Sequence, residues 1–480
     1  MAGHSHENAF DHFNGRSHEG LTVYSRRGMI KTSLAGIGGL SVTELLRQQA
    51  EARNNGLNVA TGKSVILLWM AGGPSHIDTW DPKPSRPYEN RGPFGVTSTK
   101  LSGVQICEHL PKQAAMLDKF TILRSVDARK SNHEPNMVFQ TGHRGASPRT
   151  NPRGHTFPAI GSVVAKHHGP NQTGALPYVA FQRSRSHIAY SGYLGKKFDP
   201  FIAEGACRLP IYDLVGKDTG KVTAARMFQT SPGVTVKRIA GRQNLLQQLD
   251  QARHQLDAQA AGSLDPYNQQ ALSLLADPKV QQAFDLKKES TKTRERYGKH
   301  LWCQKALLAR RLVEAGSAFV TIDLSYHTAS GTWDTHGDNI PPYGGIKKGL
   351  GPLLPLFDHL ITTLVTDLED RGLLDDVLVI AMGEFGRTPN IGTQESTDGR
   401  NHWPVVMSMC LAGGGMRHGQ VIGATEADGS DIKHRPVTPG DLSATIYHHF
   451  GIPQTTTYLD PRGRPNYVVA ENGKPIRELI

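Results

Sequence analysis

Two pairs of side chains in the second half of the sequence combine a carboxylate with an imidazole. Asp334 and His336 are two residues apart, so in an extended segment they project to the same side. Such a pair offers a hard oxygen and a borderline nitrogen to one cation. Glu384 and His402 stand in two later segments and form a second candidate pair. Both pairs indicate a site for a divalent metal ion.

The loop 72–84 carries a third group of chemically active side chains, Ser75, His76 and Asp78. Its opening glycines let the backbone turn sharply. The loop then presents a hydroxyl, an imidazole and two carboxylates, those of Asp78 and Asp81, within seven positions. Ser75 is the hydroxyl available as a nucleophile, and His76 is a candidate general base or metal ligand. The structural alternative is a turn begun by Asp before Pro.

Two further kinds of residue could contact an anion. His133 opens a helix-like element at 132–140, where the helix dipole favours an anion or a nucleophile. It is another candidate base or ligand, and the alternative is that it only caps the helix. Arg387 and Arg400 have the planar fork that grips an oxyanion at two points. For Arg387 the alternative is a salt bridge to Glu384.

Apolar runs and helix-period segments must position these loops. The runs typical of buried strands are 64–70, 120–124, 178–181, 318–324, 377–382 and 405–411. The segments with helical periodicity are 158–167, 236–260, 299–316, 349–371 and 438–450. This alternation predicts an α/β fold with a largely parallel central sheet and helices on both faces. Because ligands gather at the carboxyl ends of such strands, we expect the loops to meet at one edge of the sheet.

The first sixty residues differ from the rest. Ser25, Arg26 and Arg27 precede Lys31 and a short, weakly apolar run at 32–42, which resembles a twin-arginine export signal. That run is too short for a stable membrane span, which needs about 20 apolar residues. The alternative is a basic amphipathic helix. We therefore expect a signal segment and linker at 1–60 and one α/β domain at 61–480, with a helical insertion near 236–316, in a periplasmic or secreted protein.

Composition narrows the class of partner. The 54 Lys and Arg residues exceed the 43 Asp and Glu residues by 11, but they are dispersed and form no stripe interleaved with aromatic residues. This argues against a nucleic-acid partner. The 22 His residues outnumber the 15 Phe residues, as metal or phosphate chemistry would favour. The 4 Cys residues form no CxxC motif, so a zinc-ribbon framework is excluded. Nothing in the sequence specifies an oligomeric state.

Five strings, in this order, resemble a known family of exported bacterial proteins, domain of unknown function 1501. They are GGPSHIDTWDPKP, WDTHGDN, GEFGRTP, GRNHWP and TPGDLSATIYHHFGI. The resemblance covers roughly residues 60–460. It implies the alkaline-phosphatase-like, or sulfatase-like, superfamily and its α/β fold.

The resemblance also implies a site. Matched by position, the implied metal ligands are Asp78, Asp334, His336, Glu384 and His402. The position of the superfamily's nucleophile holds His133, and no C-x-P-x-R string is present for conversion to formylglycine. Covalent catalysis of the sulfatase kind is therefore not expected from that position, and Ser75 remains the available hydroxyl.

These observations predict an exported, metal-dependent hydrolase of phosphate or sulfate esters. One or two divalent cations, Zn or Mn from the mixed Asp, Glu and His ligands, would act on a small anionic ester. The alternative, favoured by the missing nucleophile, is a non-catalytic exported metal-binding or assembly protein that keeps the fold. A serine hydrolase is disfavoured because the sequence has no G-x-S-x-G elbow.

Overall fold

The computed structural model describes residues 17–18, 21–22 and 62–480, except 133–136, 147–155, 226–277, 329–330, 393–394 and 461. The chain separates into two units, residues 1–59 and 60–480. The first unit contains the paired strands β1 (Ser17–His18) and β2 (Leu21–Thr22). Within the described ranges, no helix has the length and apolarity needed to cross a bilayer.

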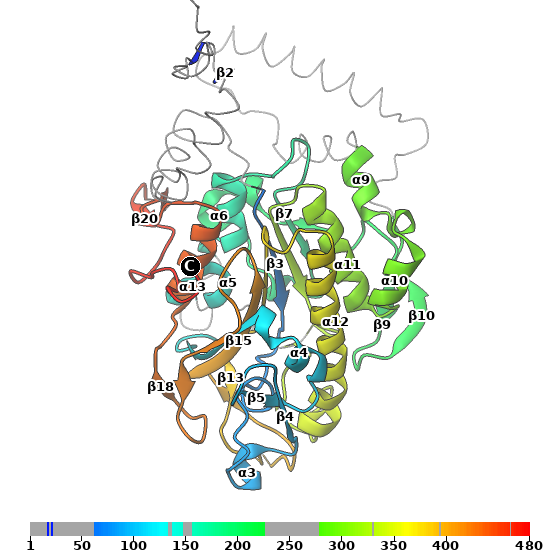
Figure 1. Ribbon diagram of the computed structural model, residues 1–480, viewed down its shortest axis with the longest axis vertical. Coiled ribbons are helices and arrows are strands. Elements are labelled where there is room, and N and C mark those ends of the chain that lie inside the picture. The colour runs from blue at the N-terminus through cyan, green and yellow to red at the C-terminus, as the bar shows by residue number, and fades with distance from the viewer. Residues whose placement is uncertain are drawn as a thin grey trace, which may run out of the picture. The chain divides into compact units, whose positions relative to one another are not determined.

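An eight-stranded sheet forms the centre of the second unit, in the order β16-β6-β15-β12-β3-β11-β7-β8 (Figure 1). Its strands are β3 (Ser64–Trp69), β6 (Phe120–Asp127), β7 (Tyr178–Phe181), β8 (Phe201–Ile202), β11 (Phe319–Asp323), β12 (Val377–Met382), β15 (Val406–Gly413) and β16 (Gln420–Ile422). The first strand, β3, pairs in parallel with both β11 and β12. The prediction of an α/β fold with a largely parallel central sheet is confirmed.

One strand departs from the parallel arrangement. β15 pairs antiparallel with both β12 and β6, so its last residue, Gly413, lies opposite Leu378 near the start of β12. The carboxyl end of β15 therefore lies at the edge opposite the carboxyl ends of β3, β11 and β12. His402 still reaches the carboxyl-end edge of those three strands, because it precedes β15 rather than following it.

Two apolar clusters cover the two faces of the sheet. Side chains alternate along a strand, so Val65 and Leu67 of β3 belong to one cluster, whereas Ile66 and Leu68 belong to the other. The first cluster includes residues of α5, α6 and α13, and the second includes residues of α4, α11 and α12. Burial on both faces explains why the strands read as continuous apolar runs. Figure 1 shows α6 and α13 on one side of β3 and α11 and α12 on the other.

The helices of this unit include those predicted at 158–167, 299–316, 349–371 and 438–450, and two short ones, α3 and α4, that were not predicted. They are α3 (Tyr88–Arg91), α4 (Pro111–Ala115), α5 (Val138–Thr141), α6 (Ile160–His167), α9 (Pro278–Phe284), α10 (Thr291–Tyr297), α11 (Leu301–Glu314), α12 (Gly351–Asp370) and α13 (Pro439–His449). A π-helical turn at Gly345–Leu350 leads into α12. The segment predicted at 236–260 lies outside the described residues. α13 begins with a capping box in which Thr438 and Asp441 bond each other's backbone, which fixes its first turn.

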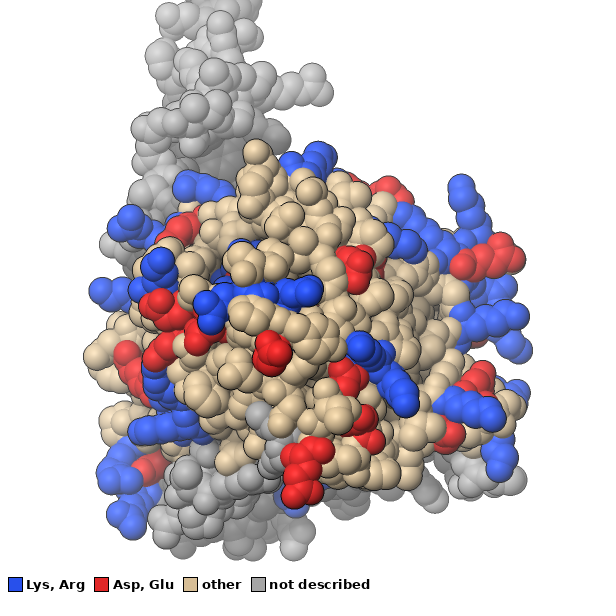
Figure 2. Space-filling model, turned by 90° about the horizontal axis from the view of Figure 1, so that it is seen from below, with Lys and Arg blue, Asp and Glu red and all other residues tan. Residues whose placement is uncertain are grey.

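Five pairs of short antiparallel strands surround the sheet. They are β4 (Val96–Ser98) with β5 (Gln105–Cys107), β9 (Pro210–Tyr212) with β10 (Asp218–Val222), β13 (Gly386–Arg387) with β14 (His402–Trp403), β17 (Ala424–Thr425) with β18 (Ile432–His434), and β19 (Thr457–Leu459) with β20 (Pro465–Tyr467). The elements α3 and β13, which follow β3 and β12 in the chain, lie toward the bottom of Figure 1. Seen from that side, basic and acidic side chains are interspersed over the surface (Figure 2).

Candidate metal centre

Asp334, His336 and His402 meet at the carboxyl-end edge of the sheet. One ligand atom from each residue can be chosen so that all three atoms lie within 4.8 Å of one another. Asp334 Oδ2 is 3.9 Å from His402 Nε2, and the two imidazole rings are 4.2 Å apart. The Asp334 side chain is fully buried, whereas those of His336 and His402 are 15% and 25% exposed. The group is therefore accessible from its imidazole side.

The three side chains fit a divalent cation. A carboxylate with two imidazoles is a donor set that suits Zn and Mn, and three protein ligands leave a position for water or substrate. His336 Nδ1 and the His336 backbone N–H also contact Asp334 Oδ1, and these contacts orient the imidazole toward the carboxylate. The spacing of two residues predicted that Asp334 and His336 would face the same side, and the structure places them so.

Arg387 holds the carboxylate of this group. Its side chain is fully buried, and Nη1 lies 2.7 Å from Asp334 Oδ1. Nε donates to the Gly73 carbonyl at 2.8 Å, and Nη2 donates to the Gly72 carbonyl. The structure thus gives Arg387 a protein carboxylate as its partner, in place of Glu384 or a ligand oxygen. The reason is topological, because β13 places Arg387 against the backbone carbonyls of the loop that follows β3.

Glu384 lies beside the cluster rather than within it. It is buried at the end of β12, and its Oε1 accepts a hydrogen bond of 2.7 Å from the Gly72 N–H. Gly72 has φ of +119°, and a Cβ there would lie 2.4 Å from the backbone nitrogen of Asp334. Only glycine allows this approach. Glu384 therefore fixes the turn against which the Asp334 backbone packs.

The structure places Ser75 and Asp78 in a separate buried network. The Ser75 hydroxyl donates to Asp78 Oδ2 at 2.6 Å, and Arg400 Nε donates to the same oxygen at 2.7 Å. All three residues are buried. Asp78 thus serves as the counter-charge of Arg400, and Ser75 presents no free hydroxyl. Neither joins the three-residue group, contrary to the roles of ligand and nucleophile expected from the sequence, and Arg400 has a carboxylate partner in place of a ligand oxyanion.

His76, a candidate base or metal ligand, has a structural position. His76 is buried, and its Nε2 donates to the Gly429 carbonyl at 2.9 Å. Burial lowers the pKa of His76 to about 4, against the opposing effect of Asp81. The imidazole is therefore neutral at pH 7, but its position is structural. His133 lies outside the described residues.

Sequence reasoning missed His327, which lines a cavity of about 270 Å³ near the cluster. The ring of Tyr343, also in the cavity wall, is 5.7 Å from the rings of both His327 and His336. His327 is 4% exposed, and its Nδ1 has no hydrogen-bond partner among the described residues. Its place shortly after the end of β11 was the available signal, because such loops line sites in parallel sheets.

His327 is electrostatically coupled to the cluster. Burial lowers the pKa of His327, the nearby His187 lowers it further, and Asp334 and Asp323 oppose this shift. His187 Nδ1 itself donates to Asp323 Oδ2 at 2.9 Å in a fully buried pair. A neutral imidazole, whose buried Nδ1 has no partner among the described residues, thus belongs to a residue that lines a cavity near the candidate metal ligands.

The sequence of the second unit matches one protein family over nearly its whole length. The family described as "Protein of unknown function (DUF1501)" matches residues 62–480, and the chain belongs to it. The matched range includes the strings that surround Asp334, Glu384 and His402. No curated protein has a sequence that matches the chain.

Solved structures that are distantly similar to the chain include a sulfatase, a phosphonate monoester hydrolase and a periplasmic domain in complex with Zn. The PsFucS1 sulfatase from Pseudoalteromonas sp. is 13% identical, with 95% of this chain and 78% of that chain covered and a TM-score of 0.37. The phosphonate monoester hydrolase SpPMH from Silicibacter pomeroyi is 14% identical, with coverages of 86% and 76% and a TM-score of 0.32. The C-terminal periplasmic domain of EcEptC from Escherichia coli, in complex with Zn, is 10% identical, with coverages of 87% and 92% and a TM-score of 0.32.

Proposed function

We propose that the chain is a metal-dependent hydrolase of phosphate or sulfate esters. The observation that carries this proposal is the convergence of Asp334, His336 and His402 at the sheet edge, near a cavity that a small ester can enter. A bound Zn or Mn ion would polarise the ester and activate the attacking water. The resemblance of the family's strings to the alkaline-phosphatase-like superfamily supports the same chemistry.

The buried Arg387 prepares Asp334 for this role. Its three donor atoms bond the carboxylate and two carbonyls of the loop after β3, so the carboxylate cannot rotate freely. Partners of this kind orient a ligand, and their loss commonly costs 10- to 100-fold in metal affinity. Arg387 is therefore a positioning residue, which acts through Asp334 and not on the substrate.

The cavity supplies a base and a cation. His327 is neutral at pH 7, because burial lowers its pKa, and it is the candidate base among the residues that line the cavity. Lys348 lines the same cavity and is exposed, so its ammonium can meet the charge of an anionic ester. Ser75 has no part in this scheme, since its hydroxyl is buried against Asp78.

A second candidate function is metal binding without catalysis. The burial of Ser75 favours it, because the hydroxyl that the sequence offered as a nucleophile is committed to Asp78. In that case the same three residues would hold a cation in an exported binding or assembly protein.

Metal analysis followed by activity assays separates the two functions. Purified protein is assayed for Zn and Mn content and for hydrolysis of 4-nitrophenyl phosphate and 4-nitrophenyl sulfate, before and after chelation. The hydrolase proposal expects bound metal and turnover that chelation abolishes and metal restores. His402→Ala should lose both, whereas His434→Ala, at an exposed position of β18, should lose neither. Stoichiometric metal without turnover would favour the binding function, and absence of metal would overturn both.

We also propose that the protein acts outside the cytoplasm. The support is the twin-arginine pattern at Arg26 and Arg27, which lies outside the described residues. A small anionic ester in the periplasm or medium would then be the substrate.

A further inference from the structure

A second cavity lies at the same edge of the sheet, on the side of β7 and β8. Its volume is about 180 Å³, and its walls include the residues that follow β7, β8 and β11. Carboxyl ends of parallel strands are where ligands bind in α/β sheets. None of the side chains of the candidate metal centre lines this cavity. The cavity is therefore distinct from the metal centre, although Tyr326 lines both this cavity and the one beside that centre.

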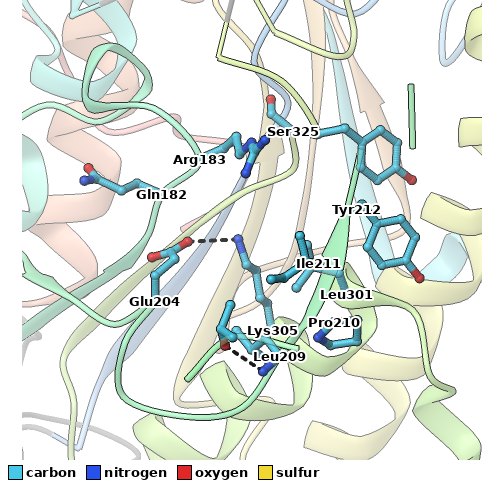
Figure 3. A pocket seen from close by; sticks show the side chains of 12 residues that line it. Gln182, Arg183, Glu204, Leu209, Pro210, Ile211, Tyr212, Leu301, Lys305 and Ser325 are labelled. Carbon is cyan, nitrogen blue, oxygen red and sulfur yellow. Dashed lines mark hydrogen bonds and ion pairs between the residues drawn. The ribbon is translucent and has the colours of Figure 1, made fainter. Parts of the chain in front are cut away.

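Three polar groups in this cavity are built to meet a negative charge. Arg183 is exposed, and its guanidinium has no hydrogen-bond or ion-pair partner among the described residues. Lys305 is only 3% exposed, although it carries a charge. The Ser325 hydroxyl is buried and has no hydrogen-bond partner in the described part of the chain. In Figure 3, the Arg183 guanidinium lies between Ser325 and the Lys305 ammonium.

The fold holds these groups in place. Asp323, the last residue of β11, accepts hydrogen bonds from the Arg183 N–H at 2.7 Å and from His187 at 2.9 Å. This fixes the loop that carries Arg183 against the strand that leads to Ser325. Lys305 comes from α11 and lies 3.0 Å from Glu204 Oε1. With two cations and one carboxylate, the cavity wall keeps a positive charge for an anion to balance.

The opposite wall is apolar and aromatic. The rings of Tyr212 and Tyr326 stack at 5.7 Å, and Tyr326 stacks in turn on Trp302 at 4.6 Å. Leu209 and Ile211 also line the cavity. Figure 3 shows Tyr212 on one side of the cavity and Glu204, Arg183 and Lys305 on the other. A ligand that fills the cavity must therefore be charged at one end and apolar at the other.

We infer that this cavity binds a small ligand with an oxyanion at one end and a ring at the other. The oxyanion lies among Arg183, Lys305 and Ser325, and the ring packs on Tyr212 and the aliphatic wall. The shared chemistry is that of an aromatic carboxylate, sulfonate or ester of sulfate or phosphate. The inference does not require hydrolysis, because the site is distinct from the candidate metal centre.

Binding of benzenesulfonate tests the inference, because a sulfonate has no ester bond to hydrolyse. Titration calorimetry on metal-free full-length protein compares benzenesulfonate and benzoate with methanesulfonate and phenol. The first two should bind, and methanesulfonate and phenol should each bind at least tenfold more weakly, since each lacks one half of the ligand. Benzoate against benzenesulfonate distinguishes a carboxylate from a tetrahedral oxyanion.

Variants locate the binding. Arg183→Ala and Ser325→Ala should each weaken benzenesulfonate binding at least fivefold. Arg462→Ala, at another exposed arginine without an ion pair in the described chain, should not change it. Asp334→Asn should also leave it unchanged, which separates this site from the metal centre. Equal affinity for Arg183→Ala and the wild type, or no binding of either aromatic anion at millimolar concentration, would overturn the inference.

Discussion

Asp334 is the residue on which the candidate metal centre depends. Its carboxylate is fully buried, contacts His336 and Arg387 through Oδ1, and turns Oδ2 toward His402. A buried charge must be paired, and Arg387 provides the pair when no metal is bound. The same carboxylate can therefore serve the fold and a cation.

The first prediction concerns the charge of Asp334. Asp334→Asn should lower metal affinity at least tenfold, because the amide keeps an acceptor for Arg387 but supplies no negative ligand. It should also destabilise the fold by about 1–3 kcal/mol, since Arg387 loses its counter-charge. Metal content and denaturant unfolding measure the two effects. Glu384→Gln is the matched control: it keeps an acceptor for the Gly72 N–H, so it should lose less metal. Full metal occupancy in Asp334→Asn would contradict the proposed metal site.

The second prediction concerns Arg387. Arg387→Ala should reduce metal affinity about 10- to 100-fold, although the residue is no ligand, because Asp334 loses its orientation. Arg387→Lys should not restore it, since one ammonium cannot reproduce the planar fork. In a double-mutant cycle, Arg387→Ala and Asp334→Asn should be non-additive, because the residues are in contact. Unchanged metal content in Arg387→Ala would contradict the positioning role.

Among the elements, the turn after β3 decides whether the site can assemble. Gly72 and Gly73 both have positive φ, and they pass between the Asp334 backbone on one side and Phe385 on the other. Their carbonyls receive Arg387, and the Gly72 N–H is held by Glu384. The loops that follow the three strands β3, β11 and β12 thus contact one another at this turn.

The third prediction follows from this turn. Gly72→Ala should abolish metal binding and cost at least about 2 kcal/mol of folding free energy, because its Cβ would lie 2.4 Å from the Asp334 nitrogen. Gly103→Ala is a matched control with φ of +75° and nothing within 4 Å of the added Cβ. It should cost only about 1 kcal/mol and spare the metal. Thermal unfolding and metal content of both variants check this, and equal behaviour would show that the turn tolerates a side chain.

At the scale of the whole molecule, buried neutral histidines predict sensitivity to acid. Burial lowers the pKa of His449 to about 4, from the ordinary 6.5, and its Nε2 donates to the Ser64 carbonyl at 3.0 Å. His76 is lowered to about 4 for the same reason. Between pH 4 and pH 6.5, these two histidines bind protons in the unfolded chain but not in the folded chain. Stability is therefore full above pH 6.5 and falls as the pH drops toward 4.

The fourth prediction tests this linkage. Each such histidine should contribute on the order of 3 kcal/mol to the loss between pH 6.5 and 4. His449→Gln keeps a donor for Ser64 but cannot titrate, so its unfolding free energy should fall less steeply with pH than that of the wild type. His434→Gln, at an exposed position, should keep the wild-type dependence. Denaturant unfolding at a series of pH values measures the slopes. A wild-type slope in His449→Gln would count against this account.

The fifth prediction concerns the route of the whole chain. Changing Arg26 and Arg27 together to Lys should retain the protein in the cytoplasm, because the twin-arginine pattern requires both guanidinium groups. Fractionation of cells that express each form measures this. Changing Arg16 and Arg47 to Lys is the matched control, because it makes the same substitution twice outside the pattern. Unaltered periplasmic recovery of the Arg26 and Arg27 variant would refute the signal interpretation.

The sequence by itself determined the strands and the pair Asp334 and His336. Strands buried on both faces need continuous apolar runs, which local composition displays. The positions of β3, β7, β11 and β12 were therefore predictable within a residue or two. The pair was predictable because a spacing of two sets the direction of both side chains.

Only the tertiary structure decided which partners the buried charges take. Arg387 pairs with Asp334 and Arg400 with Asp78, contacts between loops that follow different strands. The antiparallel direction of β15 brings His402, which precedes it, to the cluster. Ser75, in the loop after β3, instead donates its hydroxyl to the buried Asp78. No local pattern encodes such contacts, because each depends on where several strands end in space. A buried charge takes the nearest counter-charge that the assembled sheet edge offers, so its partner emerges only with the fold.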